Sequence, residues 1–198
     1  MTRCRYRLHL PEGFLQKDVN EPVVGEILSR ALDVREVRRG DPRLREPDLL
    51  LDGVGEEVTF AAEGKHLSSF IGEYCDGVYD PDEARNAMML PIFSALDRKS
   101  SKQYVNAPVR VAVLCMLELF DWTADVYGEA LEQLPRRERD AFFSILQKLY
   151  LESGRFSEIH LLVPTLTRSW AVFEIGSGVQ YLVPVGKDPA LPYFEEIL

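Results

Sequence analysis

The chain of 198 residues has little cysteine and no long apolar run. Its three cysteines, Cys4, Cys75 and Cys115, are odd in number, widely spaced and without a CxxC pair, so they indicate neither a disulfide framework nor a zinc site. No segment approaches the roughly 18 consecutive apolar residues that a membrane-spanning helix needs. We therefore expect a protein of the reducing cytoplasm that does not enter a membrane.

Positive charge is also scarce, because 23 lysine and arginine residues face 32 aspartate and glutamate residues, giving a net charge of −9. This balance disfavours a broad basic surface for nonspecific binding of nucleic acid. Any nucleic-acid contact is therefore expected to be local. The chain also lacks a glycine-rich phosphate loop, a GxSxG motif and an HExxH motif, so P-loop, α/β-hydrolase and zincin chemistry are not supported.

With 46% hydrophobic residues, the chain is long enough for one good core, which predicts a single domain. We divide that domain into an N-terminal strand and connector over 1–20, a central core over 21–120, and C-terminal helices and strands over 121–198. The alternation of apolar and basic residues over 3–10 predicts a strand. An apolar stripe over 23–32 predicts a helix that starts near Asn20-Glu21-Pro22.

The rest of the chain reads as a mixture of helices and strands. Residues 35–46 form a charged connector, and a helix follows Asp80, with Pro91 expected to kink or split it. The nearly continuous apolar run over 109–117 is typical of a central strand. Beyond it we expect two helices divided by Pro135, over residues 124–134 and 136–152. Three further strands are expected over residues 159–163, 170–175 and 179–185, followed by a loosely packed tail over 189–198.

Residues 47–65 are the most informative stretch, because their pattern predicts a β-hairpin. A two-residue turn at Gly53-Val54 would place Asp48 opposite Thr59, with Glu57 on the same face of the sheet. A three-residue turn would move Asp48 to the other face. Two carboxylates on adjacent strands repel each other unless a cation lies between them, and Mg²⁺ or Mn²⁺ with its preference for oxygen ligands is the expected partner of Asp48 and Glu57.

Pro47-Asp48 followed by Glu57-x-Thr59 resembles the motif of the PD-(D/E)xK nuclease superfamily, which has the restriction-endonuclease-like fold. The chain departs from this motif at Thr59, where the family has lysine and where a hydroxyl cannot supply the positive charge. The resemblance implies an α/β fold in which a mixed sheet of αβββαβ order is flanked by helices, with C-terminal helices and strands added. We expect the third strand of this core within residues 67–71.

The resemblance also implies a reaction and its residues. The protein would be a metal-dependent nuclease that hydrolyses phosphodiester bonds in DNA or RNA with water as the nucleophile. Asp48 and Glu57 would hold the metal and Glu26 would be a third ligand. Lys99 or Lys102, at the basic end of the second helix, would stabilise the scissile phosphate or replace the missing lysine, as Lys65 could. A homodimer is left open.

Two other interpretations stay open. The chain could be a catalytically silent module of the same fold, in which Thr59 marks lost chemistry and the surface binds a protein or nucleic-acid partner. It could also be a structural α/β protein unrelated to nucleases, with a half-buried hairpin whose acidic side chains are solvated. His66 lies close enough in sequence to the hairpin to act as a general base, although a surface or hydrogen-bonded histidine is the simpler explanation.

Overall fold

The computed structural model describes residues 5–9, 11–14, 16–61, 81–105, 108–115, 133–165, 168–185 and 191–197. Its centre is a seven-stranded mixed sheet with the strand order β2-β3-β4-β5-β6-β7-β8. These strands are β2 (Val37–Arg39), β3 (Leu49–Leu51), β4 (Val54–Phe60), β5 (Arg110–Leu114), β6 (Glu158–Pro164), β7 (Ser169–Glu174) and β8 (Gln180–Pro184). Strands β4, β5 and β6 run parallel, and the other neighbours are antiparallel. The mixed α/β class predicted from the sequence is confirmed.

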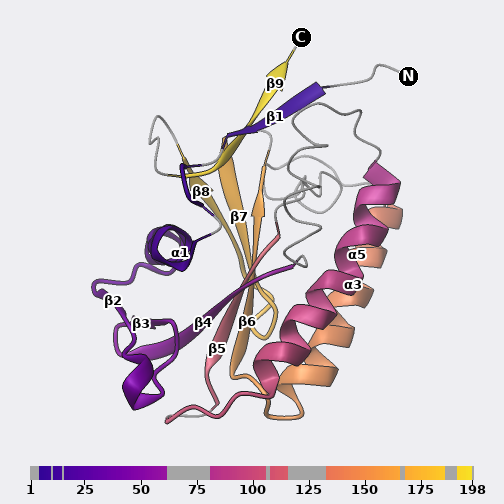
Figure 1. Cartoon of the computed structure of the whole chain (residues 1–198). Coiled ribbons are helices and arrows are strands. Elements are labelled where there is room, and N and C mark those ends of the chain that lie inside the picture. Colours follow the sequence, from indigo (N-terminus) through magenta and orange to yellow (C-terminus); the bar gives the residue numbers. More distant parts are fainter. Residues whose placement is uncertain are drawn as a thin grey trace.

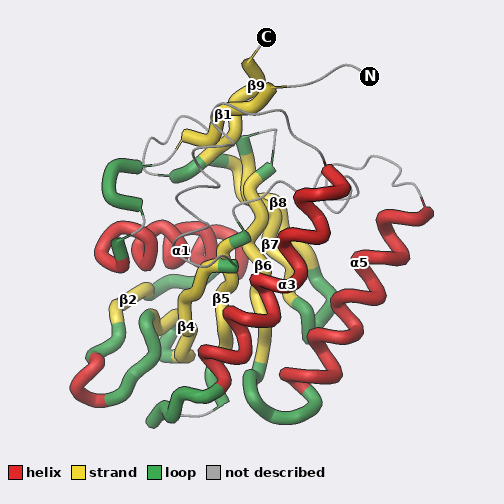
Figure 2. Tube along the Cα trace, turned by 45° about the vertical axis from the view of Figure 1, so that its right-hand side comes forward, coloured by secondary structure: helices red, strands yellow, loops and turns green. Residues whose placement is uncertain are grey.

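Helices cover both faces of this sheet (Figure 1). Helix α1 (Lys17–Leu32) lies on one face, and α3 (Pro81–Ser100) and α5 (Gln133–Leu146) lie side by side on the other, as the rotated view in Figure 2 also shows. A short π-helix, η3 (Gln147–Leu151), continues α5, and a 3₁₀ turn, η1 (Pro42–Leu44), follows β2. Among the described residues, no helix has the length and apolar composition required to cross a membrane.

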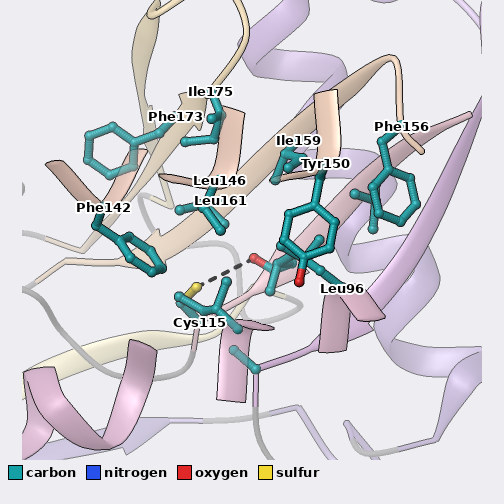
Figure 3. Close-up of a cluster of buried hydrophobic side chains, with 14 of the residues drawn as sticks. Leu96, Cys115, Phe142, Leu146, Tyr150, Phe156, Ile159, Leu161, Phe173 and Ile175 are labelled. Atoms are coloured by element: carbon teal, nitrogen blue, oxygen red, sulfur yellow. Dashed lines mark hydrogen bonds between the residues drawn. The ribbon is translucent and has the colours of Figure 1, made fainter. Parts of the chain in front are cut away.

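Each face of the sheet has its own apolar core. Under α3 and α5, aromatic and aliphatic side chains converge from both helices, from η3 and from strands β6 and β7 (Figure 3). Tyr150 belongs to this core, and its hydroxyl donates to Asp97 Oδ1 at 2.9 Å, which ties η3 to α3. The core under α1 includes Trp170, whose Nε1 donates to the carbonyl of Pro192 at 2.8 Å. Coverage of both faces explains why β5 is apolar from Val111 to Leu114.

Several predicted element boundaries are wrong. Helix α1 begins at Lys17, three residues before Asn20, and contains Pro22 in its second turn. Helix α3 runs through Pro91 without a break, and α5 begins at Gln133 rather than after Pro135, while residues 124–132 of the other helix expected there lie outside the described residues. Pro135 is the third residue of α5 and costs the helix little, because the first amides of a helix have no acceptor within it.

Pairing partners account for two further corrections. The charged connector over 35–46 contains β2, which pairs with β3 and so completes a three-stranded meander with β4. The stretch over 67–71, where we expected that third strand, lies outside the described residues. The C-terminal tail contains β9 (Tyr193–Ile197), which pairs with β1 (Arg5–His9) in a separate two-stranded sheet. Local composition cannot reveal a strand whose partner lies almost a whole chain length away.

Candidate active site

The β3–β4 hairpin turns at Asp52-Gly53, not at Gly53-Val54 as predicted. Both turn residues have positive φ, 48° and 81°, and Leu51 pairs with Val54 across the turn. Such a turn favours aspartate followed by glycine and matches the twist of the strands. The ladder is thereby displaced by two residues, so continuing it past Leu49 sets Asp48 opposite Glu57 rather than Thr59. A displacement by two keeps both carboxylates on one face.

Close backbone packing holds Asp48 in place. The amide of Gly40 donates to the carbonyl of Asp48 at 3.1 Å, and the amide of Val58 donates to Asp48 Oδ2 at 3.0 Å. A Cβ atom on Gly40 would lie 1.8 Å from the carbonyl oxygen of Pro47, so only glycine fits here. Main-chain contacts therefore fix both the backbone of Asp48, through Gly40, and its carboxylate, through Val58.

The ammonium group of Lys99, near the end of α3, lies between the two carboxylates. Lys99 Nζ donates to Asp48 Oδ2 at 2.9 Å and also to Glu57 Oε2. Glu57 is 1% exposed and Lys99 is 6% exposed, so this contact is buried. Two carboxylates that contact one nitrogen atom must converge, which brings together three of the site residues predicted from the sequence.

Two further lysines contact the same carboxylates from the solvent side. Lys102 Nζ donates to Glu57 Oε2 at 3.1 Å, and Lys17 Nζ donates to Asp48 Oδ1 at 2.8 Å. Their side chains are 44% and 66% exposed, so they form an accessible rim above the buried Lys99. We call Lys17, Asp48, Glu57, Lys99 and Lys102 the carboxylate–lysine cluster. Sequence patterns gave no indication of Lys17, which reaches Asp48 from α1 across 31 residues.

The charges around Asp48 favour the ionised form of its carboxyl group. Burial opposes ionisation of Asp48, but the Lys99 charge and the hydrogen bonds from Lys17, Lys99 and the Val58 amide together hold its pKa well below the ordinary value. The hydroxyl of Tyr104 lies beside the cluster, and burial and the negative charge of Glu57 raise its pKa. This hydroxyl is buried beside Glu57 and makes no hydrogen bond of regular geometry within the described residues. It is a protonated donor that a bound group could use.

Thr59 and Glu26 are placed differently from the expectation. Thr59 is buried, and its Oγ1 accepts a hydrogen bond from Arg98 Nη2 at 3.0 Å, so a guanidinium lies beside the position where the family has lysine. Glu26 pairs with Arg30 one turn along α1 at 2.7 Å and does not contact the cluster. Another acid of α1, Glu21, lies closer, because Lys17 Nζ is 3.4 Å from its Oε1. Lys65 and His66 lie outside the described residues.

The cluster meets part of what a hard divalent cation requires. Mg²⁺ commonly binds one or two protein carboxylates and completes its shell with water and substrate phosphate, so Asp48 and Glu57 fit it. A group of three or more metal-binding side chains is not found within the described residues. The three ammonium groups contact three carboxylates, those of Asp48, Glu57 and Glu21, so the formal charges balance.

A second buried polar network lies on the α1 face of the sheet. His160 is fully buried, with Nδ1 at 2.9 Å from Glu56 Oε1 and Nε2 at 3.3 Å from Glu174 Oε1. Burial opposes a charged imidazole, but the Glu56 charge and the hydrogen bonds to both carboxylates raise the pKa of His160 to about 9. Arg110 Nε lies 3.1 Å from Glu56 Oε2. Glu56 and Glu57 thus serve different faces of β4.

Comparison with known proteins adds no relative. Protein-family models, curated proteins and solved structures were each searched with this chain, and none of the three searches returned a match. The functional interpretation therefore depends on the geometry of the carboxylate–lysine cluster.

Proposed function

We propose that the protein is a Mg²⁺- or Mn²⁺-dependent nuclease that hydrolyses phosphodiester bonds in DNA or RNA. The observation that carries this proposal is the contact of Lys99 Nζ with both Asp48 and Glu57. A lysine beside two convergent carboxylates is the set of groups that the PD-(D/E)xK resemblance implies. Here the lysine comes from α3 instead of from position 59 on β4.

The order of the described elements supports the resemblance. Helix α1 is followed by the antiparallel strands β2, β3 and β4, then by α3, and then by β5, which is parallel to β4. This is an αβββαβ order in which β2 takes the place of the third strand. Asp48 precedes β3, Glu57 lies on β4 and Lys99 lies on α3, so the three groups come from successive elements of that order.

Each residue of the cluster has a distinct role in the proposed reaction. Asp48 and Glu57 would hold the divalent metal, which supplies Lewis-acid activation of water and of the phosphate when it is bound. Lys17 and Lys102, exposed at the rim, would contact the non-bridging oxygens of the phosphate. Lys99 would orient the attacking water and balance the charge that develops on the phosphate. The Tyr104 hydroxyl, which keeps its proton, would donate a hydrogen bond to the substrate.

The experiment is a cleavage assay with single- and double-stranded DNA and RNA in the presence of MnCl₂ or MgCl₂. Asp48→Ala, Glu57→Ala and Lys99→Ala should each lower the cleavage rate by at least about 100-fold, because each removes a group that stabilises charge in the transition state. Glu26→Gln is the matched control, and it should cleave at the wild-type rate. Thermal unfolding checks that the variants are folded.

One observation favours a second candidate, a silent module that binds phosphate groups without hydrolysis. Lys99 Nζ already bridges the two carboxylates, so a metal would have to displace it or share its ligands. A silent module would bind oligonucleotides in EDTA and would cleave none of the four substrates with either metal. That result would refute the nuclease proposal and leave the binding function.

A further inference from the structure

A hydrogen-bonded surface turn over residues 40–46 lies next to the cluster, because the amide of Gly40 donates to the carbonyl of Asp48. Its two acidic residues are engaged within the turn and with its neighbouring strand. Asp41 Oδ1 accepts from the amide of Arg43 at 2.8 Å, and Glu46 Oε2 accepts from the amide of Asp41 at 2.8 Å. The carboxylate of Glu46 also accepts hydrogen bonds from both terminal nitrogens of Arg38, each at 3.0 Å. These bonds and the bond from the Asp41 amide lower the pKa of Glu46 to about 2.

The two arginines of this turn face solvent. Arg43 and Arg45 are exposed, and within the described parts of the chain their guanidinium groups make neither an ion pair nor a hydrogen bond. Arg45 has a left-handed backbone with φ 54°, which ends η1 and fixes the direction in which the chain leaves it. In a chain with a net charge of −9, two unpaired arginines on a turn whose acids are already engaged form a local positive surface.

This surface is continuous with the cluster. The amide of Val105 donates to the carbonyl of Arg45 at 3.4 Å, and Val105 follows the segment that carries Lys102 and Tyr104. Leu44 and Val105 are 59% and 62% exposed, so aliphatic side chains lie among the basic ones. We call Arg43, Leu44, Arg45 and Val105 the arginine turn surface. It extends from the rim at Lys102 across η1.

We propose that the arginine turn surface holds the strand of a polynucleotide on one side of the bond that is cut. The inference rests on the proposed function of the cluster and adds the path that the polynucleotide takes across the surface. Guanidinium groups bind phosphate with two parallel hydrogen bonds, and the exposed aliphatic side chains offer contact to sugars and bases. The enzyme therefore prefers a polymer over a small phosphodiester, and much of its affinity comes from outside the cluster.

The test compares the double variant Arg43→Ala/Arg45→Ala with the matched control Arg137→Ala/Lys148→Ala. The control removes the same charge from exposed residues of α5 and η3. Affinity for a labelled single-stranded oligonucleotide of about 20 nucleotides is measured in EDTA at several salt concentrations. Loss of two phosphate contacts should reduce the slope of log K against log salt by about 1.4 and should weaken binding about 25-fold at 0.1 M salt. The control should change neither.

A cleavage assay distinguishes the role of this surface from the role of the cluster. With MnCl₂, the Arg43→Ala/Arg45→Ala variant should lose kcat/KM on the long oligonucleotide, mainly through KM, and should cleave a nucleoside p-nitrophenyl phosphodiester as the wild type does. Oligonucleotide binding that matches the control variant overturns the proposal. Polyglutamate is tested as a second ligand. If the Arg43→Ala/Arg45→Ala variant loses affinity for polyglutamate but not for the oligonucleotide, the proposal is also overturned and an acidic protein partner is indicated. If the wild type cleaves nothing but the arginine variant still loses affinity, the surface stands and the nuclease proposal fails.

Discussion

Replacement of Lys99 by methionine separates the charge of this residue from its volume. The Lys99 side chain is 7% exposed and that of Glu57 is 2% exposed. Removal of one partner from a buried ion pair costs roughly 3 to 5 kcal/mol, because the remaining charge is left without compensation. Here Glu57 keeps Lys102, and Asp48 keeps Lys17 and the Val58 amide. The expected loss of unfolding free energy is therefore at the lower end, about 3 kcal/mol.

The assay is urea unfolding at pH 7, first in EDTA and then with MnCl₂. A divalent cation can take the place of the missing ammonium group, so Mn²⁺ should stabilise Lys99→Met more than the wild type. At a free metal concentration of about 100 times Kd, the gain would be about 2.7 kcal/mol. Lys148→Met, a change at an exposed position of η3, should alter stability by less than about 0.5 kcal/mol. Equal stability of Lys99→Met and wild type in EDTA would refute the charge argument, and equal Mn²⁺ effects would refute the metal site.

Two further predictions concern the sheet around the cluster. The pKa of His160, raised to about 9, lies above its unfolded value of about 6.5, so its contribution to stability is complete below pH 6.5 and is lost as the pH rises toward 9. His160→Gln should remove that dependence from urea midpoints measured between pH 6 and 10, and an unchanged profile would contradict it. Gly40→Ala should destabilise the protein by about 2 kcal/mol and lower cleavage, because its Cβ would displace the Pro47 carbonyl next to Asp48. Gly53→Ala meets no neighbour but is strained by its φ of 81°, so it should cost about 1 kcal/mol and still spare cleavage, because the strain lies in the turn and not beside Asp48.

The residues of the cluster show which parts of the site can be predicted from local sequence patterns. Asp48 and Glu57 could be paired from the hairpin alone, because strand alternation depends only on the parity of the turn. The turn itself was misplaced, yet the two-residue displacement preserved the shared face. Lys99 and Lys102 stood out as a basic helix end, but which of them is buried between the carboxylates follows from how α3 packs on β4. The resemblance predicts Glu26 as the site residue of α1, whereas Lys17 is the residue of α1 that reaches Asp48.

The sequence by itself determined the mixed α/β class, most strands of the central sheet and the face that two acidic residues share, since all of these follow from local periodicity. Only the tertiary structure decided that β2 completes the meander, that β9 pairs with β1 and that Lys17 and Lys99 meet at Asp48. In the cluster these contacts join residues that are 31 and 51 positions apart in the sequence. In the β1–β9 pair they join residues separated by almost the whole length of the chain. Such partners are selected by strand pairing and by packing of helices on the sheet, and both depend on residues far apart in the sequence, which no local pattern encodes.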